Sequence, residues 1–221
     1  MATEERLDII EAVLDLFGKT FAEELGIVVQ GNSPEALFQL LCAALLFSAR
    51  ISARIATDAT KALLDMGWTT PTKMAATTWE ERTRALNRSG YARYDESTSR
   101  MLGESTELLL QRYDGDLRNL RSEAGRDPGE ERRKLKEFKG IGDVGVDIFF
   151  REAQVTWDEL FPFMDRRSKE GARALGLPDD PVELLELCER DDYPRLVAGL
   201  VRAQLEDGYE RIQEQAGVSP G

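Results

Sequence analysis

The chain has 221 residues, no histidine and a formal net charge of −12, with 29 Lys and Arg against 41 Asp and Glu. The lack of histidine excludes Ser-His-Asp and Cys-His catalysis and every histidine-based metal site, so acid–base chemistry must use carboxylates, Lys or Tyr. The acidic balance argues against tight non-specific binding of nucleic acid, and no apolar run approaches the roughly 20 residues of a membrane span.

Apolar residues recur at helical spacing along nearly the whole chain, which predicts an all-α fold. Ser33 before Pro34 is typical of a helix start, and Thr78 with Glu81 has the spacing of a capping box. We expect a loop over 121–129. The expected helices, in chain order, are 9–17, 21–25, 34–49, 51–66, 72–76, 78–88, 94–113, 130–138, 144–153, 165–175, 181–190 and 193–207. Helix 34–49 is apolar on most of its surface, which predicts that it is the central buried helix.

A Gly-x-Gly turn between two of these helices is the strongest candidate for a binding site. It comprises Lys139, Gly140, Ile141 and Gly142. Two glycines one residue apart allow a tight turn and a close approach of backbone N–H groups to a ligand, and the helix that follows contributes the positive end of its dipole. The preceding helix is basic and includes Arg133 and Lys136. Together these features favour binding of a phosphate diester, although an ordinary αα-hairpin has the same pattern.

A second candidate lies downstream, where Asp165 opens a helix after the apolar segment Phe161-Pro162-Phe163-Met164. Asp is a common helix N-cap, so the motif taken alone favours a structural role. Its distance along the chain from the Gly-x-Gly turn, however, favours a functional role.

The turn Gly140-Ile141-Gly142, followed about twenty residues later by Pro162 and Asp165, resembles the helix-hairpin-helix/Gly-Pro-Asp superfamily of base-excision DNA glycosylases, which includes endonuclease III. Residues 33–50 resemble the buried second helix of that family, and the segment from Asp165 to Pro178 resembles its Asp-helix-Leu-Gly-Leu ending. The similar region covers roughly residues 33–205. The resemblance implies an endonuclease III-like, two-lobed helical fold.

The resemblance also implies roles for individual residues. Asp165 would be the catalytic carboxylate that stabilises an oxocarbenium-like sugar while a flipped-out base is released. Arg50 would fill the gap left by that base, and Tyr91 would be the wedge in the DNA stack, although an ordinary core or surface aromatic is an equally good interpretation of Tyr91. Lys139, Gly140, Ile141 and Gly142, with Arg133 and Lys136, would contact the DNA backbone.

Three departures from the family pattern refine this hypothesis. Val144 stands where bifunctional members have a catalytic lysine, and valine cannot form a Schiff base. Asp143 stands where the family usually has a basic residue, and its charge would repel phosphate. The four-cysteine cluster is absent, because the chain has only Cys42 and Cys188, which stand in apolar helical patterns typical of buried thiols.

The sequence therefore predicts a helical barrel over 31–153, which carries the hairpin, and a second helical lobe formed by 1–30 and 154–221, which carries Asp165. The predicted function is DNA base-excision repair by a monofunctional DNA N-glycosylase, a hydrolase that uses water as nucleophile and has no lyase activity. A catalytically silent DNA-binding relative and an α-helical protein-interaction domain are the alternatives.

The predicted partner is double-stranded DNA, bound weakly and in a salt-dependent manner, with no membrane partner. We expect a monomer located in the cytoplasm and associated with the nucleoid. No iron–sulfur cluster, metal or other cofactor is expected in the chemistry, and the resemblance allows a monovalent cation held by hairpin carbonyls.

Overall fold

The computed structural model describes residues 2–218, and the residues in regular elements there are helical, with no β-strand in this range. The predicted all-α class is confirmed. The chain divides into two compact units, one formed by residues 25–159 and the other by the segments before and after it. The unit boundaries lie six residues from the predicted lobe boundaries at both junctions.

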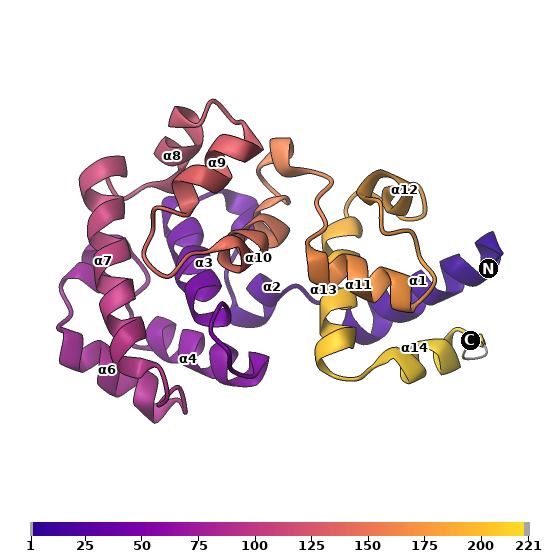
Figure 1. The fold of residues 1–221 in the computed structure, drawn as a ribbon, viewed down its shortest axis with the longest axis horizontal. Coiled ribbons are helices and arrows are strands. Elements are labelled where there is room, and N and C mark those ends of the chain that lie inside the picture. The colour runs from indigo at the N-terminus through magenta and orange to yellow at the C-terminus, as the bar shows by residue number, and fades with distance from the viewer. Residues whose placement is uncertain (1, 219–221) are drawn as a thin grey trace. The chain divides into compact units, whose positions relative to one another are not determined.

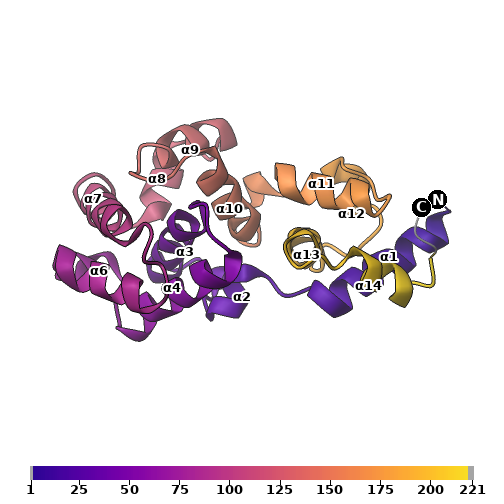
Figure 2. The same cartoon turned by 60° about the horizontal axis from the view of Figure 1, so that its bottom comes forward.

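The unit formed by residues 25–159 is built around α3 (Pro34–Phe47), ten of whose residues are buried. Ser33 caps this helix by accepting a hydrogen bond from the Ala36 amide at 3.1 Å. Helix α3 packs against α4, α7, α8 and α10, and Figures 1 and 2 show it between α7 and α10, with α4 alongside. The other helices of this unit are α4 (Ala53–Asp65), α5 (Pro71–Ala75), α6 (Trp79–Arg88), α7 (Asp95–Tyr113), α8 (Leu117–Glu123), α9 (Pro128–Leu135) and α10 (Asp143–Ala153).

The second unit has α1 (Thr3–Phe17) packed against α13 (Tyr193–Leu205) and α14 (Tyr209–Gln215), while α11 (Arg166–Ala174) packs on the same α13. Helix α12 (Pro181–Leu185) completes this unit, and the short α2 (Phe21–Leu25) leads into the other one. Its core includes Ile9, Val13, Leu196, Val197 and Leu200. The residues of this core come from both the N-terminal and the C-terminal part of the sequence. Helices α1 and α13 therefore bury each other's apolar residues.

Two helices were not expected from the sequence. Helix α8 occupies part of the predicted loop 121–129, begins at the N-cap Asp116 and buries Leu117 and Leu120. Helix α14 follows the last predicted helix and buries Ile212. Both have seven residues and bury only one or two apolar side chains, so neither gives a strong periodic signal.

No helix in residues 2–218 has both the length and the apolar character needed to cross a membrane.

Candidate nucleic-acid and catalytic site

The Gly-x-Gly turn joins α9 to α10 and is held in place by neighbouring helices of the same unit. The Ile141 amide donates to the Phe138 carbonyl at 3.0 Å, and the Ser105 hydroxyl of α7 donates to the Lys139 carbonyl at 2.9 Å. Gly140 has a φ of +87°, a conformation in which an L side chain is strained. A Cβ there would also lie 2.7 Å from Met101 Sδ and 3.2 Å from Leu45 Cγ. Gly140 is therefore required by the turn itself.

Gly142 differs from Gly140 in its backbone conformation and in the space around it. It is the N-cap of α10, its backbone is extended, and no atom lies within 4 Å of the position that a Cβ would take. Its backbone is exposed at the N-terminus of an 11-residue helix. Helix N-termini bind anions through free N–H groups and the helix dipole, and a glycine here lets a ligand approach the backbone closely. The backbone of Gly142 is therefore uncrowded on the side where a Cβ would stand.

Arg133 of α9 and Lys136, just after this helix, are paired with carboxylates. Lys136 Nζ lies 2.8 Å from Asp143 Oδ1, and this hydrogen bond and charge hold the pKa of Asp143 below its ordinary value. Arg133 pairs with Glu130 at 2.8 Å and with Glu137 at 3.2 Å. The sequence already placed these carboxylates nearby, but only the structure shows that Arg133 and Lys136 are engaged. Their attraction for phosphate is reduced accordingly.

Several exposed cations of this unit make no ion pair within residues 2–218. Among them are Arg50, Arg88, Arg100 and Lys139, which stand in four separate segments. Lys139 belongs to the hairpin itself, and Met101, the neighbour of Arg100, has its Sδ 2.7 Å from the position a Cβ would take at Gly140. Ser48 Oγ lies 2.9 Å from the position a Cβ would take at Gly145 on α10, which places the Arg50 loop beside that helix. Arg88 and Arg100 were missed from the sequence, because nothing local distinguishes a paired from an unpaired arginine.

Tyr91 lies inside the unit. Its side chain is 1% exposed, and its hydroxyl donates a hydrogen bond to the Leu46 carbonyl at 3.1 Å. This contact ties the turn after α6 to the end of α3. The burial favours the core interpretation of Tyr91 that the sequence left open beside the wedge.

Asp165 lies in the other unit, at the N-cap of α11. Its Oδ1 accepts a hydrogen bond from the Ser168 amide at 2.8 Å, and the residue is 5% exposed. The Ser168 hydroxyl donates in turn to the Asp165 carbonyl at 2.9 Å. The carboxylate is therefore fixed in orientation by the first turn of α11. This cap is the structural role that the sequence allowed, and it orients the same carboxylate that the resemblance assigns to catalysis.

Val144 is 56% exposed in the first turn of α10. The position that the resemblance aligns with a catalytic lysine is thus at the surface next to the open backbone of Gly142, but it carries no amine. Within residues 2–218, no three His, Cys, Asp or Glu side chains form a group that could hold a metal ion. Burial raises the pKa of the Cys42 thiol to about 12, which keeps it protonated and unreactive.

These observations define a two-unit, all-helical protein with a Gly-x-Gly turn between two helices of one unit and a helix-capping aspartate in the other. A solved structure of a trapped endonuclease III–DNA covalent intermediate, an estranged-adenine complex, is similar to this chain with 19% sequence identity and a TM-score of 0.49. The similarity covers 76% of this chain and 73% of that one. No family model matches the sequence, and no curated protein matches it.

Proposed function

We propose that the hairpin binds a backbone phosphate of DNA. The observation that carries this proposal is the contrast between the two glycines: Gly140 is needed to form the turn, whereas Gly142 leaves the N-terminus of α10 open. A phosphate oxygen could accept hydrogen bonds from the N–H groups there, and Lys139 would add an unpaired positive charge. Arg50, Arg88 and Arg100 would extend this contact along the DNA backbone. A monovalent cation bound by hairpin carbonyls is compatible with this proposal.

We further propose that the protein is a monofunctional DNA N-glycosylase in base-excision repair. In this reaction the bond between the sugar C1′ and the base nitrogen breaks, and its electron pair leaves with the base. Water then adds its oxygen to C1′. One of its protons stays on the new C1′ hydroxyl, and the other goes to the base, directly or through solvent. The Asp165 carboxylate would stabilise the positive charge that develops on the sugar, because a fixed negative group needs no reorientation during the reaction.

The absence of an amine at position 144 supports hydrolysis over lyase chemistry. A bifunctional enzyme attacks C1′ with an amine, forms an imine and then cleaves the strand. Valine has no nucleophile, so the proposed product is an intact strand with an abasic site.

The test is single-turnover excision on duplex oligonucleotides that contain uracil, alkylated, oxidised or deaminated bases. We expect wild-type protein to release one of these bases and Asp165→Asn to be slower by at least about a hundredfold. Asp180→Asn is the matched control, because Asp180 caps α12 in the same unit by accepting from the Val182 and Glu183 amides. Equal rates for wild type and Asp165→Asn would reduce Asp165 to a helix cap. A covalent adduct trapped with borohydride would exclude the monofunctional assignment.

A catalytically silent DNA-binding protein is the second candidate. The small exposure of Asp165 and the neutralised charges of α9 favour it. Salt-dependent DNA binding without release of any tested base would select this alternative, whereas no DNA binding at low ionic strength would exclude both.

A further inference from the structure

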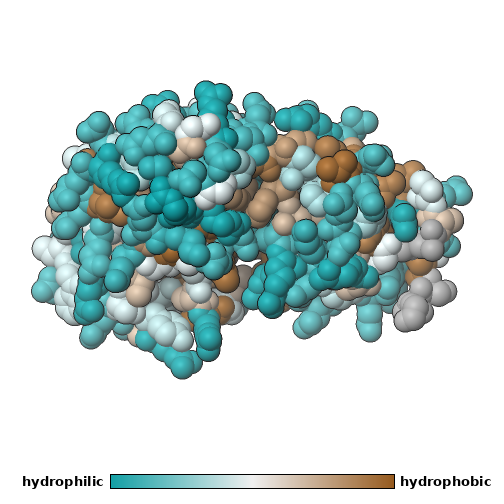
Figure 3. All heavy atoms as spheres, turned by 45° about the horizontal axis from the view of Figure 1, so that its top comes forward, coloured by the Kyte–Doolittle hydropathy of each residue, from teal (hydrophilic) through white to brown (hydrophobic). Residues whose placement is uncertain are grey.

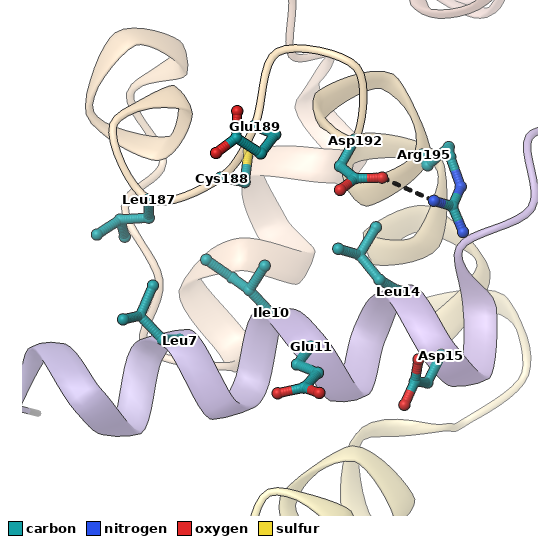
Figure 4. Close-up of a pocket in the computed structure, with 10 residues that line it drawn as sticks. All are labelled: Leu7, Ile10, Glu11, Leu14, Asp15, Leu187, Cys188, Glu189, Asp192 and Arg195. Atoms are coloured by element: carbon teal, nitrogen blue, oxygen red, sulfur yellow. Dashed lines mark hydrogen bonds and ion pairs between the residues drawn. The ribbon is translucent and has the colours of Figure 1, made fainter.

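A hollow of about 340 Å³ lies between α1 and the segment that joins α12 to α13, within a single unit. Leu7 and Ile10 of α1 point toward Leu187 and Cys188 across it, and Leu14 points toward Asp192, as Figure 4 shows. Leu7 is 45% exposed although it belongs to this apolar row. Brown spheres also gather on the surface of this unit in Figure 3. The row has the i, i+3, i+7 spacing of a helix face that packs against another helix.

The rim of this hollow is acidic. Glu11 and Asp15 stand on the outer side of α1, with their carboxylates pointing away from the opposite segment, which carries Glu189 and Asp192, as Figure 4 shows. Arg195, the cation of this lining, is paired with Asp192 at 2.7 Å and donates to the Gly18 carbonyl at 2.8 Å. Glu11 and Glu189 make no ion pair within residues 2–218, and Asp15 accepts only the amide of Gln215, at 3.3 Å. The hollow thus combines an apolar floor with unneutralised negative charge on both sides.

The hollow continues along α1. A second hollow of about 430 Å³ shares Leu14, Asp15 and Arg195 with the first and extends to Lys19. Together they form a groove along most of α1, which we call the α1 groove. Its length suits an elongated occupant better than a compact small molecule.

We propose that the α1 groove is a docking site for a short amphipathic helix of another protein, with apolar residues on one face and Lys or Arg beside them. An amphipathic helix recognises such a groove by placing apolar anchors on its floor. The carboxylates of the rim would pair with the flanking cations and discriminate against other partners. A second copy of this chain, which carries a net charge of −12, would be repelled, and so would DNA or an anionic membrane.

The probe is a synthetic amphipathic helix of about 14 residues that contains only Leu and Lys, with a scrambled peptide of equal composition and a Leu/Glu peptide as controls. Binding is measured by fluorescence anisotropy on the full chain. We expect the Leu/Lys helix to bind and to slow the alkylation of Cys188, which lines the groove, by at least about fivefold. Buried Cys42 should stay unmodified and serves as an internal check of folding.

Two charge-reversed variants locate the binding. Glu11→Lys with Glu189→Lys should weaken the peptide by at least about tenfold, whereas Glu210→Lys with Glu214→Lys, the same charge change on exposed positions of α14, should alter it less than about twofold. Leu7→Ser, a milder change at a half-exposed site, should weaken binding about threefold. The proposal is overturned if both double variants weaken binding equally, if the scrambled peptide binds as well, or if Cys188 is protected by rising protein concentration alone, which would indicate a second copy.

Discussion

Lys136 and Asp143 face each other across the hairpin, with Nζ and Oδ1 2.8 Å apart. Arg132 adds a weaker contact to the same carboxylate at 3.8 Å. The pairing places a negative charge next to the open N-terminus of α10 and occupies a cation that could otherwise reach DNA. The Lys136–Asp143 pair therefore weakens the attraction of the Gly-x-Gly turn for phosphate.

Removal of this carboxylate should strengthen DNA binding. In Asp143→Asn, Lys136 loses its partner and the carboxylate no longer repels phosphate. We expect about three- to tenfold tighter DNA binding. The slope of log K against log salt concentration should steepen by the amount of roughly one additional phosphate contact. The variant should also be slightly less stable, because Asp143 interacts favourably with the α10 dipole. Asp65→Asn, an equal charge change at an exposed end of α4, is the control. Unchanged affinity in a titration over several salt concentrations would show that DNA does not approach this turn.

The two hairpin glycines should respond differently to substitution. Gly142→Val adds a side chain to open space on extended backbone, so the protein should fold with a change of less than about 1 kcal/mol but bind DNA at least about tenfold more weakly. Gly140→Ala should instead destabilise the protein by about 1–2 kcal/mol, because alanine is strained at a positive φ. Thermal unfolding and DNA titration of both variants separate the effects. A stable Gly142→Val protein with normal DNA affinity would contradict the phosphate-site proposal.

Tyr91 should behave as a core residue. Tyr91→Phe removes the hydrogen bond to Leu46 and leaves that carbonyl without its hydroxyl donor, so we expect a loss of about 1–2 kcal/mol of stability. Base release from duplex and from single-stranded DNA should change in the same proportion, if at all. A selective loss on duplex in Tyr91→Phe or Tyr91→Ala would restore the wedge interpretation, since only duplex has a stack to open.

Two neighbouring carboxylates, the buried Glu131 and the half-buried Glu159, predict a dependence of stability on pH. Glu131 is 0% exposed, and burial, a hydrogen bond to Glu159 and the charge of Glu159 raise its pKa to about 8. Burial also acts to raise the pKa of Glu159, but its hydrogen bonds with Arg121, whose nitrogens lie 2.5 Å away, outweigh this and lower it. Glu131 is therefore protonated at neutral pH beside an ionised, arginine-bound Glu159.

The sign of the effect follows from the raised pKa of Glu131. Its stabilising contribution is fully present below about pH 4.5 and is lost as pH rises through about 8, because the folded protein holds this proton more tightly than the unfolded chain does. We expect stability to fall on the order of 2 kcal/mol between about pH 6 and pH 8.5. Glu131→Gln, which can still donate to Glu159, should flatten this decline in urea titrations. Glu130→Gln, an exposed neighbour, should leave it intact.

Local sequence patterns were sufficient to predict the all-α fold class and the positions of most helices. Ser33, Thr78 and Asp165 act as caps in the structure as their patterns predicted, because a cap depends only on the next three residues. The Gly-x-Gly turn was found for the same reason. The short α8 and α14 were missed because one or two apolar residues form no helical periodicity. Their burial is decided by the core against which they pack.

Tertiary structure alone decided which groups of the candidate site are available. Whether Lys136 is paired, Arg100 is unpaired or Tyr91 is buried depends on partners that lie up to 45 residues away in the chain, as Leu46 does from Tyr91. The same holds for the α1 groove, whose two sides come from opposite ends of the sequence. Hydrogen bonds, ion pairs and burial are set by distance in space, and a periodic pattern encodes only distance along a helix.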